Sequence, residues 1–215
     1  AFGTLLTKHG EEVLFLDRDP RAVGSVEQAG HRAIFGNALE ERTLQRAQID
    51  ERAACLALVY NEEVNLLFTR RVNEGFRGPR VYVGLRSGET GVTGEMVQEA
   101  GARILFGVAR DIELWAMRFR RGFAEIEAWL LEDQELIPED AGERELFETP
   151  EELLLPMMVE RAGRLTPTHH EHSIKRGDVV HFAVFTDRSD EAHAWLVERG
   201  WVPVVDVEGA DEGED

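Results

Sequence analysis

The sequence predicts an α/β fold, with a Rossmann-like parallel sheet followed by a smaller α+β lobe. Two observations predict it. In the first half, short apolar runs alternate with segments of helical periodicity, the pattern of a parallel sheet covered by helices on both faces. After about residue 110, apolar residues instead alternate with acidic ones, the period of a half-exposed strand. The 215 residues suffice for one large or two small domains.

Continuous apolar runs mark the strands expected in the first half, and they are 12–16, 31–35, 55–59, 81–85 and 103–106. Pro20 stands where the first intervening helix begins, and Gly30 ends it. Further helices are expected after the second, third and fourth strands, the last of them over 89–99. Four apolar residues after the third strand recur at helical spacing and predict one buried face: Val64, Leu67, Phe68 and Val72.

The second half begins with a helix expected over 111–121, whose aromatic stripe is Trp115, Phe119 and Phe123. Core packing and a contact with a second subunit are both consistent with that stripe. Strands are expected over 126–130, 153–160, 179–185 and 201–207, with a helix over 190–199. The acidic stretch 132–152 contains two prolines and is interpreted as a loop.

Composition excludes several classes of protein. The net charge is −18, from 42 acidic against 24 basic residues, which argues against a nucleic-acid binder because such a protein needs a basic face. The single cysteine, Cys55, lies inside an apolar run and excludes a disulfide framework. No apolar run approaches the ~20 residues that span a bilayer, and the first residues lack the features of a signal peptide.

Asp17 is the most informative candidate for chemistry. A carboxylate at the carboxyl end of the second strand of such a sheet can accept both hydroxyls of an adenosine ribose. That site needs a glycine-rich turn about 20 residues earlier, which would precede Ala1, so the first strand and its phosphate loop are expected upstream. Gly3 is either a remnant of that turn or part of the first helix. By spacing alone, Asp17 is equally well interpreted as an exposed turn residue.

Longer segments resemble a known family. EEVLFLDRDPRAV and GHRAIFGNALEERTLQRAQIDERAACLALVYNEEVNLLFTRRV resemble the nucleotide-binding lobe of RCK domains, which regulate potassium conductance and are also called TrkA-N or KTN domains. LLPMMVERAGRLTPTHHEHSIKRGDVVHFAV is similar to the RCK C-terminal lobe. LALVYNEEVN and DIELWAMRFRRG most resemble versions attached to sodium or cation/proton antiporters. The resemblance implies a nucleotide-binding lobe (1–108), a connecting helix (109–124) and a C-terminal lobe (125–207). The tail (208–215) is acidic and has no core-forming residue, so it is expected to be disordered.

The resemblance also implies a nucleotide site formed by Asp17, Arg18, Asn37, Ala38, Val59, Tyr60, Asn61 and Asn65. Asp17 would hold the adenosine ribose, and Arg18 could border the ribose or a phosphate. An acidic residue at this position favours NAD(H), AMP, ADP or ATP over cofactors with a 2′-phosphate. Gly36, Asn37 and Ala38 match a Gly-Asp-Ala motif at the adenine edge, with Asn37 in place of the usual Asp.

A dense cluster late in the sequence consists of His169, His170, Glu171 and His172. Neutral histidine is a common ligand for zinc, but two adjacent histidines rarely share one tetrahedral site, so no metal site is expected. The resemblance places these histidines on a surface turn. A proton-sensing role is a hypothesis, because unperturbed histidine titrates near pH 6.5.

The resemblance implies a regulatory domain, not an enzyme, on the cytoplasmic face of the membrane. It would form a homodimer or higher oligomer and gate a membrane cation transporter, of the K⁺ or Na⁺/H⁺ antiport type, through ligand-dependent rearrangement of the dimer. One alternative is an NAD-dependent Rossmann oxidoreductase, although the sequence has no Tyr-x-x-x-Lys pair and no recognisable nucleophile. Another is an RCK-like assembly domain that has lost ligand binding.

Overall fold

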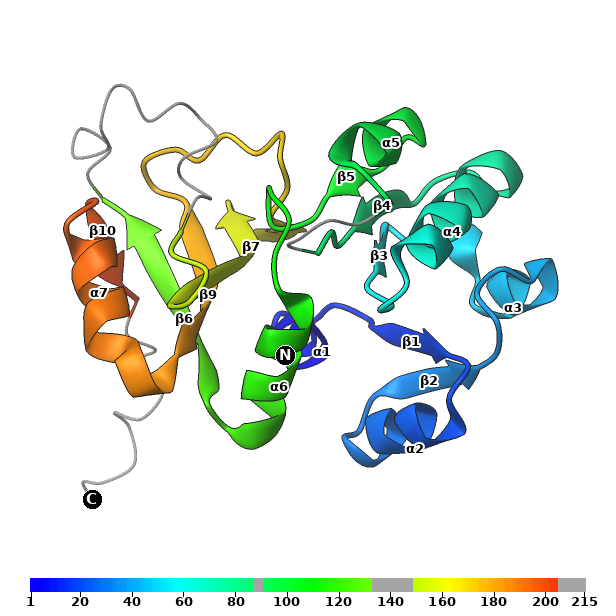
Figure 1. Cartoon of the computed structure of the whole chain (residues 1–215), viewed down its shortest axis with the longest axis horizontal. Helices are drawn as coiled ribbons and strands as arrows, with labels where there is room; N and C mark the ends of the chain where they lie inside the picture. The colour runs from blue at the N-terminus through cyan, green and yellow to red at the C-terminus, as the bar shows by residue number, and fades with distance from the viewer. Residues whose placement is uncertain (87–90, 133–148, 205–215) are drawn as a thin grey trace, which may run out of the picture.

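The computed structural model describes residues 1–86, 91–132 and 149–204 (Figure 1). Several expectations therefore fall partly or wholly outside the described residues: the start of the helix at 89–99, most of the loop at 132–152, the end of the last strand and the tail 208–215. The described chain has a parallel α/β first half and an antiparallel second half (Figure 1), which confirms the predicted fold class.

The described part of the first half contains five short parallel strands with helices between them. The strands are β1 (Leu14–Asp17), β2 (Arg32–Phe35), β3 (Ala54–Ala57), β4 (Arg80–Val83) and β5 (Arg103–Ile104). The helices are α1 (Phe2–Lys8), α2 (Pro20–Gln28), α3 (Glu41–Arg46), the 3-10 turn η1 (Ile49–Glu51), α4 (Glu62–Gly75) and α5 (Gly94–Glu99). β1 pairs with β2, and β3, β4 and β5 form a second sheet. Within the described ranges no ladder joins β1 to β3.

Side-chain caps set the starts of α2 and α4, two helices that follow strands. Asp19 accepts a hydrogen bond from the backbone N–H of Arg21 and stands before Pro20, the first residue of α2. Asn61 caps α4 in the same way through the N–H of Val64, at 3.0 Å. Such caps satisfy donors that have no partner inside the helix, so each helix begins directly after the loop that leaves its strand. The polar loop residues are thereby held at the carboxyl ends of the strands.

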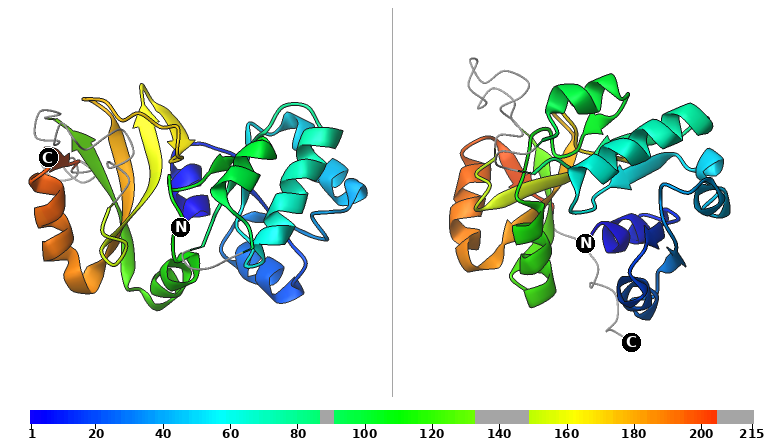
Figure 2. Two further views of the ribbon diagram at one scale, coloured as in Figure 1. Left: turned by 45° about the horizontal axis from the view of Figure 1, so that its top comes forward. Right: turned by 45° about the vertical axis from the view of Figure 1, so that its right-hand side comes forward.

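The second half is a five-stranded antiparallel sheet reached through α6 (Ile112–Arg121), which ends at Gly122 with φ of 73°. In spatial order its strands are β10 (Trp201–Pro203), β6 (Ala124–Leu131), β9 (Val179–Phe185), β7 (Leu154–Arg161) and β8 (Arg164–Pro167). The 3-10 turn η3 (Thr186–Arg188) leads into α7 (Ser189–Val197), which covers one face of this sheet (Figure 2). Ala192 and Leu196 of α7 pack in one buried cluster with Phe182 and Trp201.

Two features of β7 shape the edge of this sheet. Its register against β9 shifts between Pro156 and Met158, so Met157 is an extra residue at a β-bulge. β7 then turns into β8 through Ala162 and Gly163, both with positive φ, as a two-residue hairpin requires. β8 was not predicted, because its short mixed sequence gives no strand period.

Two sequence predictions about helical faces are corrected. Leu67 was expected in the core and is 50% exposed, while Asn65 and Thr69 are buried on the side of α4 that faces the sheet. Hydrophobic periodicity missed this rotation because those polar side chains are hydrogen-bonded inside. In the aromatic stripe, Trp115 is core, but Phe123 lies beyond the end of α6 and is 40% exposed.

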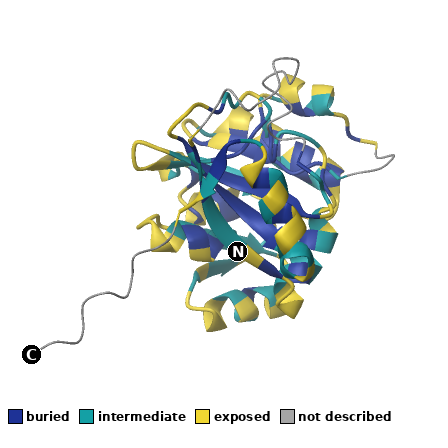
Figure 3. Ribbon diagram, turned by 90° about the vertical axis from the view of Figure 1, so that its left-hand side faces the viewer, coloured by how far each residue is buried: buried dark blue, intermediate teal, exposed yellow. Residues whose placement is uncertain are grey.

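The two halves share a buried cluster in which α1 takes part. Its members are Leu5, Tyr82, Leu105, Phe106, Trp115, Ala124, Leu155, Met157, Met158 and Ala183. Leu105 forms an isolated bridge with His169, and the N–H of Phe106 donates to the carbonyl of Thr168 at 2.8 Å. Buried residues lie inside this arrangement, and exposed residues lie on the outer helices and loops (Figure 3). None of the helices in the described ranges has the length and apolar character needed to cross a bilayer.

A bidentate ion pair stabilises the turn before β9. The Asp178 side chain is 3% exposed and accepts from Arg161 Nε at 2.7 Å and Nη2 at 2.6 Å, and from the Lys175 N–H at 2.7 Å. Burial alone would raise the pKa of Asp178, but the hydrogen bonds from Arg161 and Lys175 outweigh it, so the pKa lies below its ordinary value.

We expect Asp178→Asn to lower the free energy of unfolding at neutral pH by about 1–3 kcal/mol, because a charge-assisted bidentate pair is lost. A carboxyl with a lowered folded pKa stabilises the protein above its unfolded pKa, 3.8, and loses this effect as pH falls through the folded value. The difference between variant and wild type in urea unfolding should therefore shrink in strong acid. Asp187→Asn, at an exposed position of the same lobe, is the control. A difference that stays constant down to strong acid would contradict this interpretation.

Candidate functional site

Asp17 ends β1 beside the end of β2. The two strands are in register as far as Asp17 and Phe35, and the N–H of Gly36 donates to the Asp17 carbonyl at 2.9 Å. The half-buried Asp17 side chain accepts from the Asp19 N–H through Oδ1 at 2.8 Å. No hydrogen bond from the described residues reaches Oδ2. One carboxylate oxygen thus orients the side chain, and the other is available to a donor from outside the chain.

The loop after β2 places the next two predicted residues close to Asp17. Asn37 is exposed, and its Oδ1 accepts from the Leu39 N–H at 3.0 Å, which closes a local turn. Ala38, the next residue, is half-buried. Arg18, which directly follows Asp17, is exposed. These four predicted residues therefore form one group at the carboxyl ends of β1 and β2.

The other four predicted residues form a second group at the start of α4. Val59 and Tyr60 are 46% and 61% exposed, and Asn61 caps the helix. Asn65 is buried, and both ends of its amide bond to Val59: Nδ2 donates to the carbonyl at 2.9 Å, and Oδ1 accepts from the N–H at 3.1 Å. Asn65 therefore positions the loop and presents no free polar atom to a ligand.

Two residues that sequence reasoning missed complete this group. Glu62 is buried in the first turn of α4, and its Oε1 accepts from the Arg86 N–H at 2.7 Å. The Arg86 guanidinium lies 4.0 Å from the centre of the Tyr60 ring. Its hydrogen bond with Tyr60 and the charges of Glu113 and Glu62 raise the pKa of Arg86, so it is a permanent cation at this edge. The periodicity of apolar residues cannot reveal a glutamate that is buried and hydrogen-bonded to the backbone.

The two groups are linked through the core. Leu16 and Ile34 of the first sheet pack against the cluster that contains Ala57 and Leu66. Across the surface, Arg71 Nε on α4 donates to the Leu39 carbonyl at 3.4 Å. No hydrogen bond between described residues joins Asp17 directly to the second group.

Gly3 lies inside α1, so it is part of the first helix and not a remnant of a glycine-rich turn. A Cβ atom there would stand 2.7 Å from Phe15 Cζ and 3.1 Å from His31 Nε2, so a side chain at residue 3 would require these rings to move. The glycine therefore lets α1 approach β1 and β2 closely. Close helix–strand packing is the role of the last glycine in dinucleotide-binding fingerprints.

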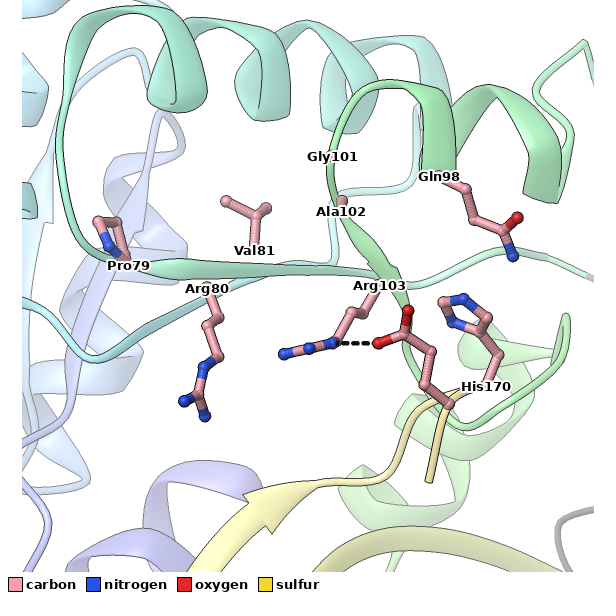
Figure 4. Close-up of a pocket in the computed structure, with 9 residues that line it drawn as sticks. Pro79, Arg80, Val81, Gln98, Gly101, Ala102, Arg103 and His170 are labelled. Atoms are coloured by element: carbon pink, nitrogen blue, oxygen red, sulfur yellow. Dashed lines mark hydrogen bonds and ion pairs between the residues drawn. The ribbon is translucent and has the colours of Figure 1, made fainter. Parts of the chain in front are cut away.

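A cavity of about 480 Å³ lies elsewhere, at the start of β4 and beside β5 (Figure 4). Arg80 and Arg103 line it together with His170 and Glu171 of the second half. Arg103 Nε pairs with Glu171 Oε2 at 2.8 Å, so this cation is already neutralised. Since parallel strands bind ligands beyond their carboxyl ends, this cavity is distinct from the predicted nucleotide edge.

The predicted surface turn of histidines is wrong for His169, which is 7% exposed. Its ring stacks on His172 with centroids 4.3 Å apart and lies 5.6 Å from Tyr82. Burial, and next the neighbouring charges of His172 and Arg103, lower the pKa of His169 to about 3. Burial also lowers the pKa of His172. His169 is therefore neutral near pH 7, which removes it from the proton-sensing hypothesis.

Parallel strands with polar side chains at their carboxyl ends, joined to an antiparallel lobe, define a Rossmann-like domain with an appended lobe. Residues 2–108 match the family model of the TrkA-N domain. Residues 2–108 are therefore a TrkA-N domain, which confirms the resemblance found in the sequence for this first lobe.

Among solved structures, the TrkA-N domain of the Escherichia coli inner membrane protein YbaL is 15% identical, with a TM-score of 0.44 over 56% of this chain and 84% of its own. The NAD(P)-binding domain of an exopolyphosphatase-related protein from Archaeoglobus fulgidus is 18% identical, with a TM-score of 0.42 over 55% and 84%. The GsuK channel bound to NAD is 14% identical, with a TM-score of 0.41 over 84% of this chain and 34% of the channel. This chain thus spans about a third of GsuK. Among curated proteins no match is found.

We expect Asn65→Ala to lower the free energy of unfolding by about 1–3 kcal/mol, because it removes both hydrogen bonds that this buried amide makes with the Val59 backbone. Asn73→Ala on the same helix is the matched control, since Asn73 Nδ2 donates to the Ala100 carbonyl at an exposed position. Urea unfolding measures both. Equal costs for the two variants would contradict a special role for Asn65.

We expect His169→Gln to reduce the loss of stability on mild acidification. The lowered pKa means that the unfolded chain binds a proton between pH 6.5 and about 3 that the folded chain excludes, so wild-type stability falls as pH drops through this window. The contribution is at most about 2 kcal/mol between pH 7 and pH 5. Melting temperature against pH measures it, with His31→Gln as the control in the first half. Parallel curves for wild type and His169→Gln would contradict a buried neutral histidine.

Proposed function

We propose that this chain is a nucleotide-sensing regulatory domain of a membrane cation transporter, working at the cytoplasmic face of the membrane. The ligand is NAD(H) or an adenine nucleotide (AMP, ADP or ATP). The observation that carries the proposal is the Asp17 carboxylate, oriented through Oδ1 at the carboxyl end of β1, with Oδ2 open to a donor. The TrkA-N match over residues 2–108 supports it.

The residues at this edge fit the parts of a nucleotide. Asp17 Oδ2 can accept from a ribose hydroxyl, and its charge disfavours a 2′-phosphate. Asn37 keeps its Nδ2 donor for a purine ring acceptor, because only Oδ1 is used by the turn. Arg86 offers a fixed cation over Tyr60, and Arg18 offers a mobile one, both suited to phosphate oxygens.

The parallel strands form two separate sheets, and this division suggests how ligand binding could be signalled. Asp17 and Asn37 belong to the β1–β2 sheet, while Tyr60 and Arg86 follow strands of the β3–β5 sheet. A ligand that contacts both groups favours the arrangement in which they are closest. Differential affinity for two arrangements is all that regulation requires, and in a homodimer the shift would reach the attached transporter. An attachment to a cation/proton antiporter is part of this proposal.

Two alternatives predict other results. An NAD-dependent oxidoreductase needs an acid or base beside the cofactor. Among the described residues, the side chains with strongly shifted pKa values are the half-buried Cys55 of β3 and the buried His169, and neither belongs to the Asp17 edge. Burial raises the pKa of Cys55 to about 11, so it is a poor nucleophile. We therefore propose binding rather than catalysis. An assembly domain without a ligand is the other alternative.

We expect NAD⁺, NADH, AMP, ADP or ATP to raise the melting temperature of the full-length protein. At a hundredfold excess over Kd, binding should add about 2.7 kcal/mol to the free energy of unfolding. Asp17→Asn should abolish the shift because it adds an amide donor where an acceptor is needed, while its Oδ1 can still bond to Asp19. Asp187→Asn should retain the full shift.

Three outcomes would oppose the proposal. No shift with any nucleotide favours an assembly domain. A shift retained in Asp17→Asn places the ligand elsewhere. Turnover of NADH with a small carbonyl substrate favours an oxidoreductase.

A further inference from the structure

Three side chains with metal-binding atoms meet where α1 touches the second-half sheet. His9 follows α1, Glu160 lies on β7 and His181 on β9, and their ligand atoms all lie within 4.8 Å of one another. Glu160 Oε2 stands 3.6 Å from His9 Nε2 and 3.4 Å from His181 Nε2. The imidazole rings meet edge to face with centroids 5.1 Å apart.

We propose that His9, Glu160 and His181 bind a divalent transition-metal ion, with zinc as the best fit. Two neutral imidazoles and one carboxylate form an N₂O set, which suits zinc and leaves a fourth position for water. Bonds of about 2.0–2.1 Å in a tetrahedron place ligand atoms roughly 3.3–3.4 Å apart. The two distances from Glu160, 3.4 and 3.6 Å, are close to this spacing, and the ligand atoms of the two histidines lie within 4.8 Å of each other.

The ligands are held in place by the fold before any ion binds. His9 Nδ1 lies 2.9 Å from the Leu5 carbonyl in its own helix, so Nδ1 carries the proton and the Nε2 lone pair faces Glu160. Leu5 is itself buried in the cluster shared by the two halves. His181 is opposite Met158 in the ladder, and Glu160 is two residues further along β7, so both side chains lie on the same face.

A second His–Glu contact, between α7 and strand β6 of the same sheet, shows what an ordinary pair looks like. His193 Nε2 stands 2.9 Å from Glu127 Oε2, at hydrogen-bond distance. The contacts of Glu160 are longer, and at 3.6 Å the one to His9 exceeds hydrogen-bond distance. Within the described ranges, the His9 set alone brings three such groups close enough to share an ion. His193 and Glu127 are therefore close enough to form a direct hydrogen bond. The side chains of His9, Glu160 and His181 are instead spaced as ligands around a shared ion would be.

Occupancy would join parts of the chain that belong to different halves. His9 ends the first helix of the TrkA-N domain, and the other two ligands belong to the central strands of the antiparallel sheet. The ion would therefore fix α1 on that sheet. This inference does not depend on the proposed nucleotide site, because none of the three ligands takes part in it.

Calorimetric titration of the metal-free full-length protein with ZnCl₂ tests the proposal. We expect one zinc ion per chain and a rise in melting temperature of roughly 5–10 °C at a hundredfold excess over Kd. His9→Ala and Glu160→Gln should each weaken binding by at least about tenfold. Co²⁺ in the site should give the intense visible absorption of a tetrahedral ion, and Mg²⁺ or Ca²⁺ should not compete, since both prefer oxygen ligands.

Controls make the result decisive. His193→Ala removes the other His–Glu contact and should leave zinc binding unchanged, as should the double variant His169→Gln/His172→Gln in the other histidine cluster. His9 is partly exposed, so its replacement tests the site even if the buried His181 cannot be changed without unfolding. The proposal is overturned if wild type binds no zinc, if His9→Ala binds as tightly as wild type, or if only the His169/His172 variant loses the ion.

Discussion

The contact between the end of β5 and the second-half sheet is the interaction on which the rest of the structure depends. Phe106 holds a positive φ of 63°, which is unfavourable for a side chain of this size. The surrounding contacts sustain it: its N–H donates to Thr168, its ring is buried, and Phe2 of α1 stacks on it at 6.0 Å. Thr168 in turn donates its N–H to the Met157 carbonyl at 3.1 Å and its hydroxyl to the Pro156 carbonyl at 2.6 Å. The two halves are thus joined by backbone and core together.

Because of this junction, the two candidate sites differ in rigidity. The His9, Glu160 and His181 set stands on the junction itself, and its ligands are attached to buried elements. The Asp17 edge lies away from it, where β1 and β2 pair only with each other among the described strands. The rigid set of His9, Glu160 and His181 suits a metal ion, which requires fixed ligand geometry. The Asp17 edge lies between two separate sheets and suits a ligand that regulates by changing their arrangement.

The sequence predicted those elements whose apolar runs are bounded by turn residues. Five parallel strands and most of the antiparallel ones lie within a few residues of their predicted positions, because a buried strand must be apolar throughout. β8 was not predicted, because it is an edge strand of four residues, polar and apolar, that pairs with β7 alone. The face of α4 was misjudged because Asn65 and Thr69 are buried polar residues, which hydrophobic periodicity cannot detect.

Asp17 was proposed from its position after a strand and the other candidate nucleotide residues from the resemblance to RCK domains, while the partners that hold them gave no signal in the sequence. Glu62 and Arg86 meet through a backbone hydrogen bond between separate strand ends, a tertiary contact without a local signal. The burial of His169 was missed for the same reason, since it depends on β5 arriving beside it. The three residues proposed as metal ligands lie far apart in the chain, and only the packing of α1 brings His9 to them.

The bulge in β7 determines how this lobe can tolerate changes in length. A bulge holds one residue more than the partner strand needs, so removing Met157 would close it and leave Met158 opposite His181, with Glu160 still on the side of both histidines. Because side chains in a strand alternate between faces, a deletion at residue 159 would instead turn Glu160 to the opposite side of the sheet. Homologous chains that share this arrangement should therefore lose a residue at position 157 more readily than at position 159.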